Sequence, residues 1–225
     1  MGKTARLAIV VVPALIILLF LGTWQLQRLG WKQELIATME DRLVEQPVAL
    51  PSGTLDLNEW AFRPVEISGR FIDATPFIFP ARTLDGAVGN DIVAPFLRDD
   101  DGTVLLVHRG WVANGASFDP APEEAVVTGV VRAPWTNTLF RPENDVSGNQ
   151  WFWMDLDTMA QSLSVPAVAP YYLSRTATGS EEGFPRARPA QPEISNNHLN
   201  YALTWYALAA ILVIITILFV RRERS

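Results

Sequence analysis

Two long apolar runs at opposite ends of the chain limit most strongly what it can fold into. Residues 7–24 and 199–220 each have about the ~20 residues that a helix needs to cross ~30 Å of hydrocarbon. The first run exceeds the ~7–15 apolar residues of a signal peptide, and no A-x-A-like cleavage site follows it. We therefore expect two transmembrane helices, of which the first is a retained anchor.

Basic residues flank both runs on their terminal sides: two precede the first run and three follow the second. The positive-inside rule therefore predicts cytoplasmic tails at residues 1–6 and 221–225, with residues 25–198 on the other side of the membrane. An Arg- and Ser-rich mitochondrial presequence is absent. The pattern favours the inner membrane of a bacterium, with the main domain in the periplasm.

Composition excludes several classes of function. The chain has a formal net charge of −6, and its flanks are basic by +4, so residues 25–198 carry −10. Such an acidic segment is poorly suited to nucleic acid or anionic lipid. The chain has no cysteine, which excludes disulfides, thiolate metal sites and covalent attachment of c-type haem.

The segment between the two runs changes from helical to strand periodicity. Residues 25–47 keep helical spacing up to Pro47, so the first membrane helix is expected to continue into the aqueous phase. Strand alternation follows in "RPVEISGRF", "FIF", "DIVAPFL", "TVLLVHRGWV", "AVVTGVVR" and "VPAVAPYYLS". An Asp-Gly turn between Leu97 and Val104 predicts a hairpin. The run "WFWMDLDTMAQSL" predicts a strand passing into a short helix, capped by Asp155 or Asp157.

These patterns predict a membrane α+β protein. Two transmembrane helices flank one antiparallel β-rich domain outside the cytoplasm, which is barrel-like or sandwich-like and has one or two short helices. Residues 25–198 form this domain, beginning with the helical extension of the first span. The segment is long enough to form one real hydrophobic core.

The residues give little support to an enzyme. The chain lacks a G-x-S-x-G, H-E-x-x-H, P-loop or dinucleotide motif and has two histidines, His108 and His198. His108 lies between alternating apolar residues of a strand, where a packed structural role is usual. We therefore expect a protein without catalytic residues.

His198 opens the second apolar run and begins a stripe of related positions. On a helix, His198, Tyr201, Ala202, Trp205 and Ala209 fall on one face. One interpretation is a membrane-interface belt, since Tyr and Trp favour headgroup depth. The other is metal ligation, in which a neutral imidazole nitrogen binds haem iron while the macrocycle lies along the small residues. Spacing alone leaves both interpretations open.

Five motifs resemble, in order, those of the Surfeit-locus protein 1 (Shy1-like) family. They are "LGTWQLQRLGWK", "RPVEISGRF", "VHRGWV", "NQWFWMDLDTMA" and "NNHLNYALTWYALA". The resemblance covers nearly the whole chain. It implies an assembly factor for haem-copper terminal oxidases such as cytochrome c oxidase, which binds haem a transiently and assists its insertion into subunit I.

The resemblance also implies a role for one residue, since the histidine that matches His198 is the suspected ligand of the haem iron. Around it we expect Trp24 to form the opposing wall or to serve as an interfacial anchor. Gln25 would reach a propionate or formyl group, and Asn197 would orient the imidazole or bond a polar group of the macrocycle. Tyr201 and Trp205 complete the expected site. Subunit I, the lipid bilayer and, as a candidate, haem a synthase are the expected partners.

Two alternatives remain open at this stage. The first is a membrane scaffold that stabilises nascent subunit I without binding haem. The second is a membrane-anchored enzyme acting on lipid or cell-wall precursors, although the sequence offers it no pair of nucleophile and base.

Overall fold

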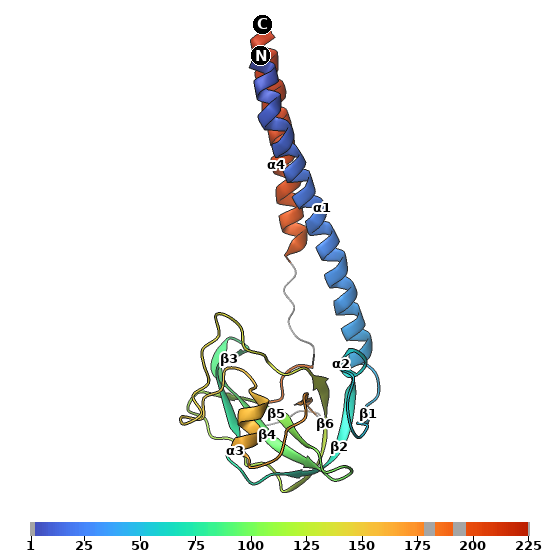
Figure 1. Cartoon of the computed structure of the whole chain (residues 1–225), viewed down its shortest axis with the longest axis vertical. Coiled ribbons are helices and arrows are strands. Elements are labelled where there is room, and N and C mark those ends of the chain that lie inside the picture. Colours follow the sequence, from blue (N-terminus) through green and yellow to red (C-terminus); the bar gives the residue numbers. More distant parts are fainter. Residues whose placement is uncertain (1–2, 178–182, 191–196, 225) are drawn as a thin grey trace. The chain divides into compact units, whose positions relative to one another are not determined.

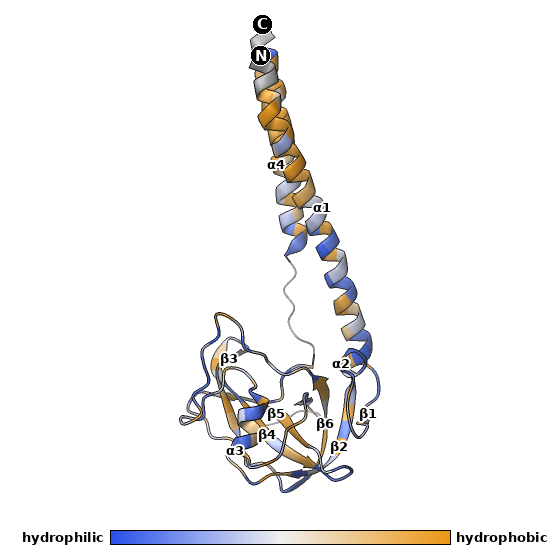
Figure 2. Ribbon diagram, in the orientation of Figure 1, coloured by the Kyte–Doolittle hydropathy of each residue, from blue (hydrophilic) through white to orange (hydrophobic). Residues whose placement is uncertain are grey.

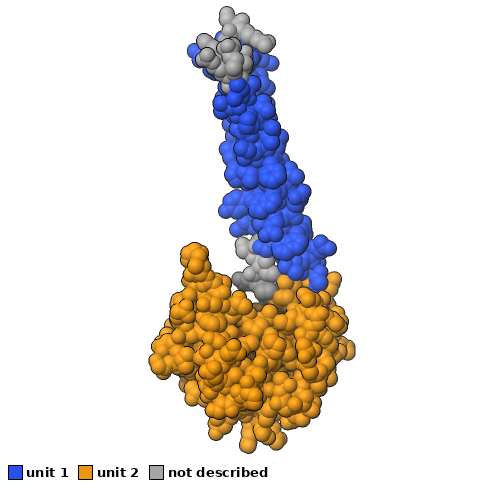
Figure 3. Space-filling model, in the orientation of Figure 1, with its two compact units in different colours: residues 1–38, 193–225 blue, residues 39–192 orange. Residues whose placement is uncertain are grey.

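The computed structural model describes residues 3–177, 183–190 and 197–224, which belong to two compact units. One unit consists of residues 1–38 and 193–225, and the other of residues 39–192 (Figure 3). The first is a pair of helices and the second is a β-rich domain.

Both ends of the chain form long helices, α1 (Lys3–Leu43) and α4 (His198–Arg224), which lie side by side (Figure 1). By length and composition, Leu7–Leu43 and His198–Arg222 are candidate membrane spans, and only 6% of each apolar window is buried. A core helix of a soluble protein would be mostly buried, so these exposed apolar surfaces favour lipid contact (Figure 2). α1 continues without a break through Pro13 and ends at Leu43.

Seven strands form the sheet of the β-rich domain in the order β1-β2-β6-β7-β5-β4-β3. An additional pairing of β2 with β4 closes five of them, β2, β6, β7, β5 and β4, into a barrel. The predicted fold class is therefore confirmed. The bounds are β1 Val48–Ala49, β2 Pro64–Phe71, β3 Phe77–Leu84, β4 Ala87–Arg98, β5 Val104–Ala113, β6 Glu124–Arg132 and β7 Tyr172–Arg175, with short helices α2 Leu57–Trp60 and α3 Leu156–Ser162.

Strand direction is where the structure departs from the antiparallel expectation. β4 and β5 form the predicted hairpin, with Leu97 opposite Val104. However, β7 runs parallel to β5, and β1 runs parallel to β2. Alternation along a strand gives its buried face but not the direction of its neighbour, so the sequence could not reveal these two pairings.

The run "WFWMDLDTMAQSL" forms a helix but not the expected strand. Gln150, just before this run, makes isolated bridges with Ile78 and Asp145, and Trp151 donates one backbone hydrogen bond to Ile78. The predicted cap is confirmed at Asp155, whose carboxylate accepts a bond from the backbone N–H of Thr158 at 3.2 Å. The strand prediction fails because aromatic alternation also occurs where side chains pack without a sheet ladder.

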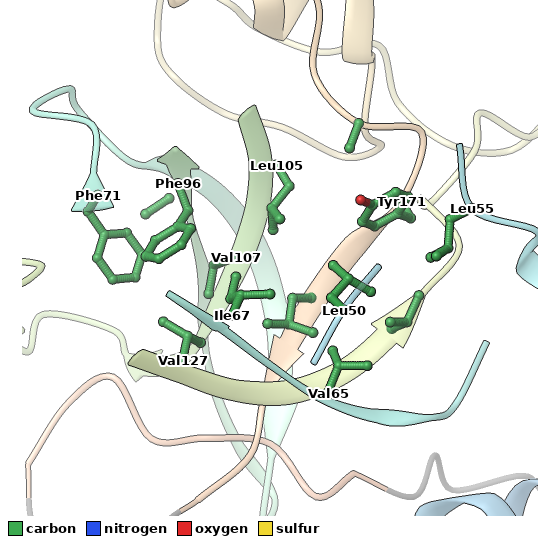
Figure 4. Close-up of a cluster of buried hydrophobic side chains, with 14 residues drawn as sticks. Leu50, Leu55, Val65, Ile67, Phe71, Phe96, Leu105, Val107, Val127 and Tyr171 are labelled. Carbon is green, nitrogen blue, oxygen red and sulfur yellow. The ribbon is translucent and has the colours of Figure 1, made fainter. Parts of the chain in front are cut away.

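Apolar side chains form two clusters on opposite faces of the sheet, since Leu105 of β5 belongs to the first and the next residue, Leu106, to the second. Figure 4 shows the first cluster, in which side chains of the surrounding strands, such as Ile67 and Leu105, point toward one another. The second surrounds Trp151, which is 1% exposed and packs edge-on against Phe77. The two clusters give the domain its own hydrophobic core.

The segment after β7, residues 183–190, lies against β5. Trp111 and Arg186 exchange two backbone hydrogen bonds of 2.8 Å. Gly110 permits this approach, because it has a φ of 138° and a Cβ there would lie 2.2 Å from the Arg186 carbonyl oxygen. The glycine of "VHRGWV" is therefore required by the backbone that crosses it.

A buried carboxylate connects the same segment to the barrel. Asp91, 2% exposed, accepts a 2.7 Å hydrogen bond from Arg188 Nε, and its carboxylate oxygens lie 3.4 Å from His108 Nε2 and 3.7 Å from Arg82 Nε. Burial acts to raise the pKa of Asp91, but His108 and Arg188 outweigh it and lower that pKa. His108 is itself 2% exposed and also contacts Trp135. It is thus a packed structural histidine, as expected from the sequence.

Replacing this carboxylate should destabilise the domain. Asp91→Asn leaves Arg188 and its neighbours without their anion, and breaking a buried ion pair costs about 3–5 kcal/mol. Because the folded-state pKa is depressed, the stabilisation is present above the unfolded pKa and is lost as the pH falls through the folded pKa. Urea unfolding, monitored by tryptophan fluorescence, should show a lower free energy of unfolding in the variant at neutral pH. This free energy should also fall less steeply in the variant than in the wild type as the pH is lowered.

Asp99→Asn is the matched control, since Asp99 is an exposed turn residue. Its free energy of unfolding should stay within about 0.5 kcal/mol of the wild type. Equal stability of the two variants would show that the buried charge cluster does not stabilise the fold.

Candidate functional site: the paired helices

Small residues allow α1 and α4 to pack closely. A Cβ at Gly22 would lie 2.9 Å from the ring of Tyr206, so a larger residue there would force this ring to shift. Thr23 donates its hydroxyl hydrogen to Leu19 O at 2.9 Å, and its oxygen lies 3.1 Å from the Tyr206 hydroxyl, which therefore acts as the donor. This contact holds the two helices together within the apolar region.

The same packing buries the small residues of the stripe on α4. Ala202 is 1% exposed and Ala209 is 4% exposed. Ala202 lies four residues from both His198 and Tyr206, whose side chains contact α1. The stripe of small residues therefore serves helix packing in this arrangement and is not an open surface for a macrocycle.

His198 and Gln25 form a polar pair between the helices. His198 Nδ1 lies 2.7 Å from Gln25 Oε1, and the imidazole is half-buried. An amide oxygen can only accept, so Nδ1 carries the proton in this pair. In the neutral ring Nε2 is then the nitrogen with the lone pair, and it has no hydrogen bond within the described residues.

The other predicted residues lie around this pair with different exposure. Trp24 is 43% exposed and Tyr201 is 57% exposed. Trp205 is half-buried, and its indole Nε1 is buried without a hydrogen-bond partner in the described parts of the chain. Asn197 is exposed, and its backbone carbonyl accepts the N–H of Tyr201 at the start of α4.

The hydrogen-bond partner of the His198 imidazole differs from the expected one. Gln25 was expected to contact a ligand group, and Asn197 to orient the imidazole or bond the macrocycle, whereas in the structure the imidazole Nδ1–H donates its hydrogen bond to Gln25 Oε1. Sequence reasoning missed Gly22, Thr23 and Tyr206 as the contact that sets the helix spacing. The signal was present in "LGTWQ", where a glycine interrupts a run of large apolar residues.

This arrangement offers a single imidazole donor. Among the residues that the structure describes, no group of three or more His, Cys, Asp or Glu side chains could together coordinate a metal ion. A metal-ligating histidine commonly donates its other ring N–H to a carbonyl or carboxylate, which fixes the tautomer and raises ligand basicity. The Gln25–His198 pair has this feature.

Gly22→Leu should separate the two helices, because the added side chain meets the Tyr206 ring. The absence of cysteine permits a direct measurement: Gln25 and His198 are both replaced by cysteine and joined by a short bifunctional thiol reagent. Cross-linking yield in membranes should fall at least severalfold when Gly22→Leu is added. Gly30→Leu is the control, since nothing lies within 4 Å of a Cβ at that position of α1. Equal yields with both substitutions would contradict the packing role of Gly22.

Comparisons with known proteins agree with the motifs of the sequence. Residues 12–210 match the sequence model of the SURF1 family. The chain is 32% identical to a SURF1-like protein of Monosiga brevicollis over 222 residues, which cover 90% of this chain and 83% of that protein. It is 31% identical to Surfeit locus protein 1 of Homo sapiens over 212 residues, or 84% of this chain and 69% of the human protein. The corresponding protein of Mus musculus is 30% identical over 211 residues, or 84% and 68%. The chain belongs to the SURF1 family.

Proposed function

We propose that this protein binds haem a transiently through His198 and assists its insertion into subunit I of a haem-copper terminal oxidase. Membership of the SURF1 family implies the coarser function, that of a cytochrome oxidase assembly factor. The observation that supports haem binding is the hydrogen bond between His198 Nδ1 and Gln25 Oε1. It leaves Nε2 as the lone-pair donor of a histidine that lies at the start of a candidate membrane span.

The residues around the pair suit a large, flat, mostly apolar cofactor. Haem iron, when bound, accepts an axial nitrogen, and His198 Nε2 would supply it. Trp24, which adjoins Gln25 in α1, and Tyr201, three residues after His198 in α4, offer exposed aromatic surface. Trp205 is half-buried on the same face of α4 as His198 and Tyr201. The donor set therefore fits haem a.

A site of this kind favours release. One axial nitrogen holds iron less firmly than the two imidazoles of an oxidase site, so transfer to subunit I runs downhill in free energy. The small residues Ala202 and Ala209 already pack in the helix pair, which leaves the cofactor a shallow apolar surface. The chain would act as a carrier and not as an enzyme.

The proposal places the protein in the inner membrane of a bacterium, with both termini cytoplasmic and the β-rich domain in the periplasm. Two candidate spans and the basic residues outside them support this orientation. Subunit I and the lipid bilayer are then its partners, and haem a synthase is the candidate donor of the cofactor.

The test is haem content after co-expression with the enzymes of haem a synthesis. The full chain is purified in detergent, and reduced-minus-oxidised spectra and the extracted haem type are recorded. Wild type should retain haem a and His198→Ala should lose it, because no second imidazole lies on either helix. A His198→Ala protein with full haem stoichiometry would exclude His198 as the ligand.

Gln25→Ala separates ligation from positioning. It removes the acceptor of Nδ1–H, and loss of such a partner typically weakens metal binding by about 10–100-fold. Haem retention during dilution should therefore be intermediate, with a shifted spectrum. Gln33→Ala is the matched control, since Gln33 is exposed on the same helix, and it should behave as wild type. Identical spectra and retention in all three proteins would remove Gln25 from the site.

A scaffold that captures nascent subunit I without haem is the second candidate function. One observation favours it: Leu139 and Phe140, adjacent in the loop after β6, are 92% and 94% exposed. Large apolar residues exposed together mark interaction sites. Co-purification of subunit I at equal yield with wild type and His198→Ala, in the absence of haem from both, would favour the scaffold.

A further inference from the structure

Arg109 is the extra residue of a β-bulge in the barrel. In the pairing of β4 with β5, Ile92 lies opposite Gly110 and Val93 lies opposite His108, so Arg109 has no partner across the ladder. Bulges re-aim a side chain and are common next to binding sites. His108 contacts the Asp91 cluster, whereas the Arg109 guanidinium lies 5.7 Å from the ring of Phe71, which belongs to the other core cluster.

The guanidinium of Arg109 is buried without an anion. The residue is 8% exposed, and no described carboxylate lies within 4 Å of it. Its Nη2 donates to the carbonyl oxygens of Asp119 and Pro120, each at 3.1 Å. The remaining N–H groups, on Nε and Nη1, have no hydrogen bond within the described residues. Some other side-chain nitrogens of the domain lack a hydrogen bond and are fully buried, but Nε and Nη1 of Arg109 are not among them, so both retain accessible surface.

This cation differs from the other buried charges of the domain. Asp91 is surrounded by cationic partners, and Arg98 is paired with Asp100 and Asp101. The Arg109 guanidinium has described hydrogen bonds only to neutral carbonyls, and burial, together with the nearby charge of Arg175, lowers its pKa against the opposing effect of Asp119. A buried charge without a counter-ion in contact is costly, and an incoming anion would reduce that cost.

Two cavities flank Arg109 and share Phe71 as a wall. Their volumes are about 610 Å³ and about 380 Å³. The larger is lined mainly by apolar side chains, including Ile72, Ala94, Phe118 and Ala121. Its two acids, Asp73 and Glu123, are exposed residues. A concave, largely apolar space with one buried charged group is the usual form of a small-molecule site.

We propose that this Arg109 pocket, formed by Phe71, Ile72, Ala94, Arg109, Phe118 and Ala121, binds an organic carboxylate with an apolar body. The carboxylate accepts a charge-assisted hydrogen bond from one of the free N–H groups of the guanidinium, on Nε or on Nη1. The apolar body lies against Phe71 and Phe118 in the larger cavity. The ligand is either a free acid or the terminal carboxylate of a polypeptide that ends in an apolar residue. This site lies in the β-rich domain and is independent of His198.

Binding is measured by isothermal titration calorimetry on the full chain in lipid nanodiscs, with empty nanodiscs as the blank. The probes are 3-phenylpropionate, its neutral amide, and N-acetylphenylalanine as a model of a polypeptide terminus. We expect the carboxylates to bind at least about tenfold more tightly than the amide, because only they form charge-assisted bonds with Arg109. Tighter binding of N-acetylphenylalanine would identify a polypeptide terminus, and tighter binding of 3-phenylpropionate a free acid.

Arg109→Gln should abolish the preference for the acid over the amide, and Arg109→Lys should keep part of it. Arg70→Gln, which removes an exposed arginine next to Phe71, should bind as wild type. Ala121→Phe should block binding of all three probes by filling the larger cavity. This variant tests the pocket independently if Arg109→Gln fails to fold. No binding to wild type, equal affinity for acid and amide, or unchanged binding in Ala121→Phe would overturn the proposal.

Discussion

The two ends of the chain are apolar helices that pair antiparallel, and this constraint shapes the rest of the structure. Thr23 meets Tyr206 and Gln25 meets His198, so positions ascend along one helix as they descend along the other. Gly22 sets the spacing, since any larger side chain would meet the Tyr206 ring. Within hydrocarbon, helices associate by close contact between small residues and by hydrogen bonds between them, and this pair has both.

The β-rich domain must receive the chain from one helix and return it to the other. It does so by placing its last strand, β7, between β5 and β6 and by running residues 183–190 against β5. Trp111 and Asp91 form hydrogen bonds with that returning segment, and Gly110 leaves room for its backbone. The family motif "VHRGWV" thus has a structural explanation at almost every polar or small position. Arg109 differs, because the described hydrogen bonds of its guanidinium go to the carbonyl oxygens of Asp119 and Pro120 and to no carboxylate.

The sequence predicted those features that depend on local periodicity and turn chemistry. The apolar ends, the Asp-Gly hairpin between Leu97 and Val104 and the Asp155 cap were all predictable in this way. The parallel pairing of β5 with β7 was not, because it joins segments more than sixty residues apart whose direction leaves no mark on alternation. The strand expected at Trp151 was wrong, because aromatic spacing records burial and not hydrogen bonding.

The same division applies to the candidate sites. The sequence by itself determined that a histidine opens the second apolar helix and that arginine follows His108 in a strand. The tertiary structure decided that Gln25 fixes the His198 tautomer and that Ala202 and Ala209 are buried. It also decided that Arg109 is buried beside a cavity. The physical reason is that a residue's type sets which bonds it can form. Its actual partners come from segments far away in the chain, and only the folded backbone brings them within reach.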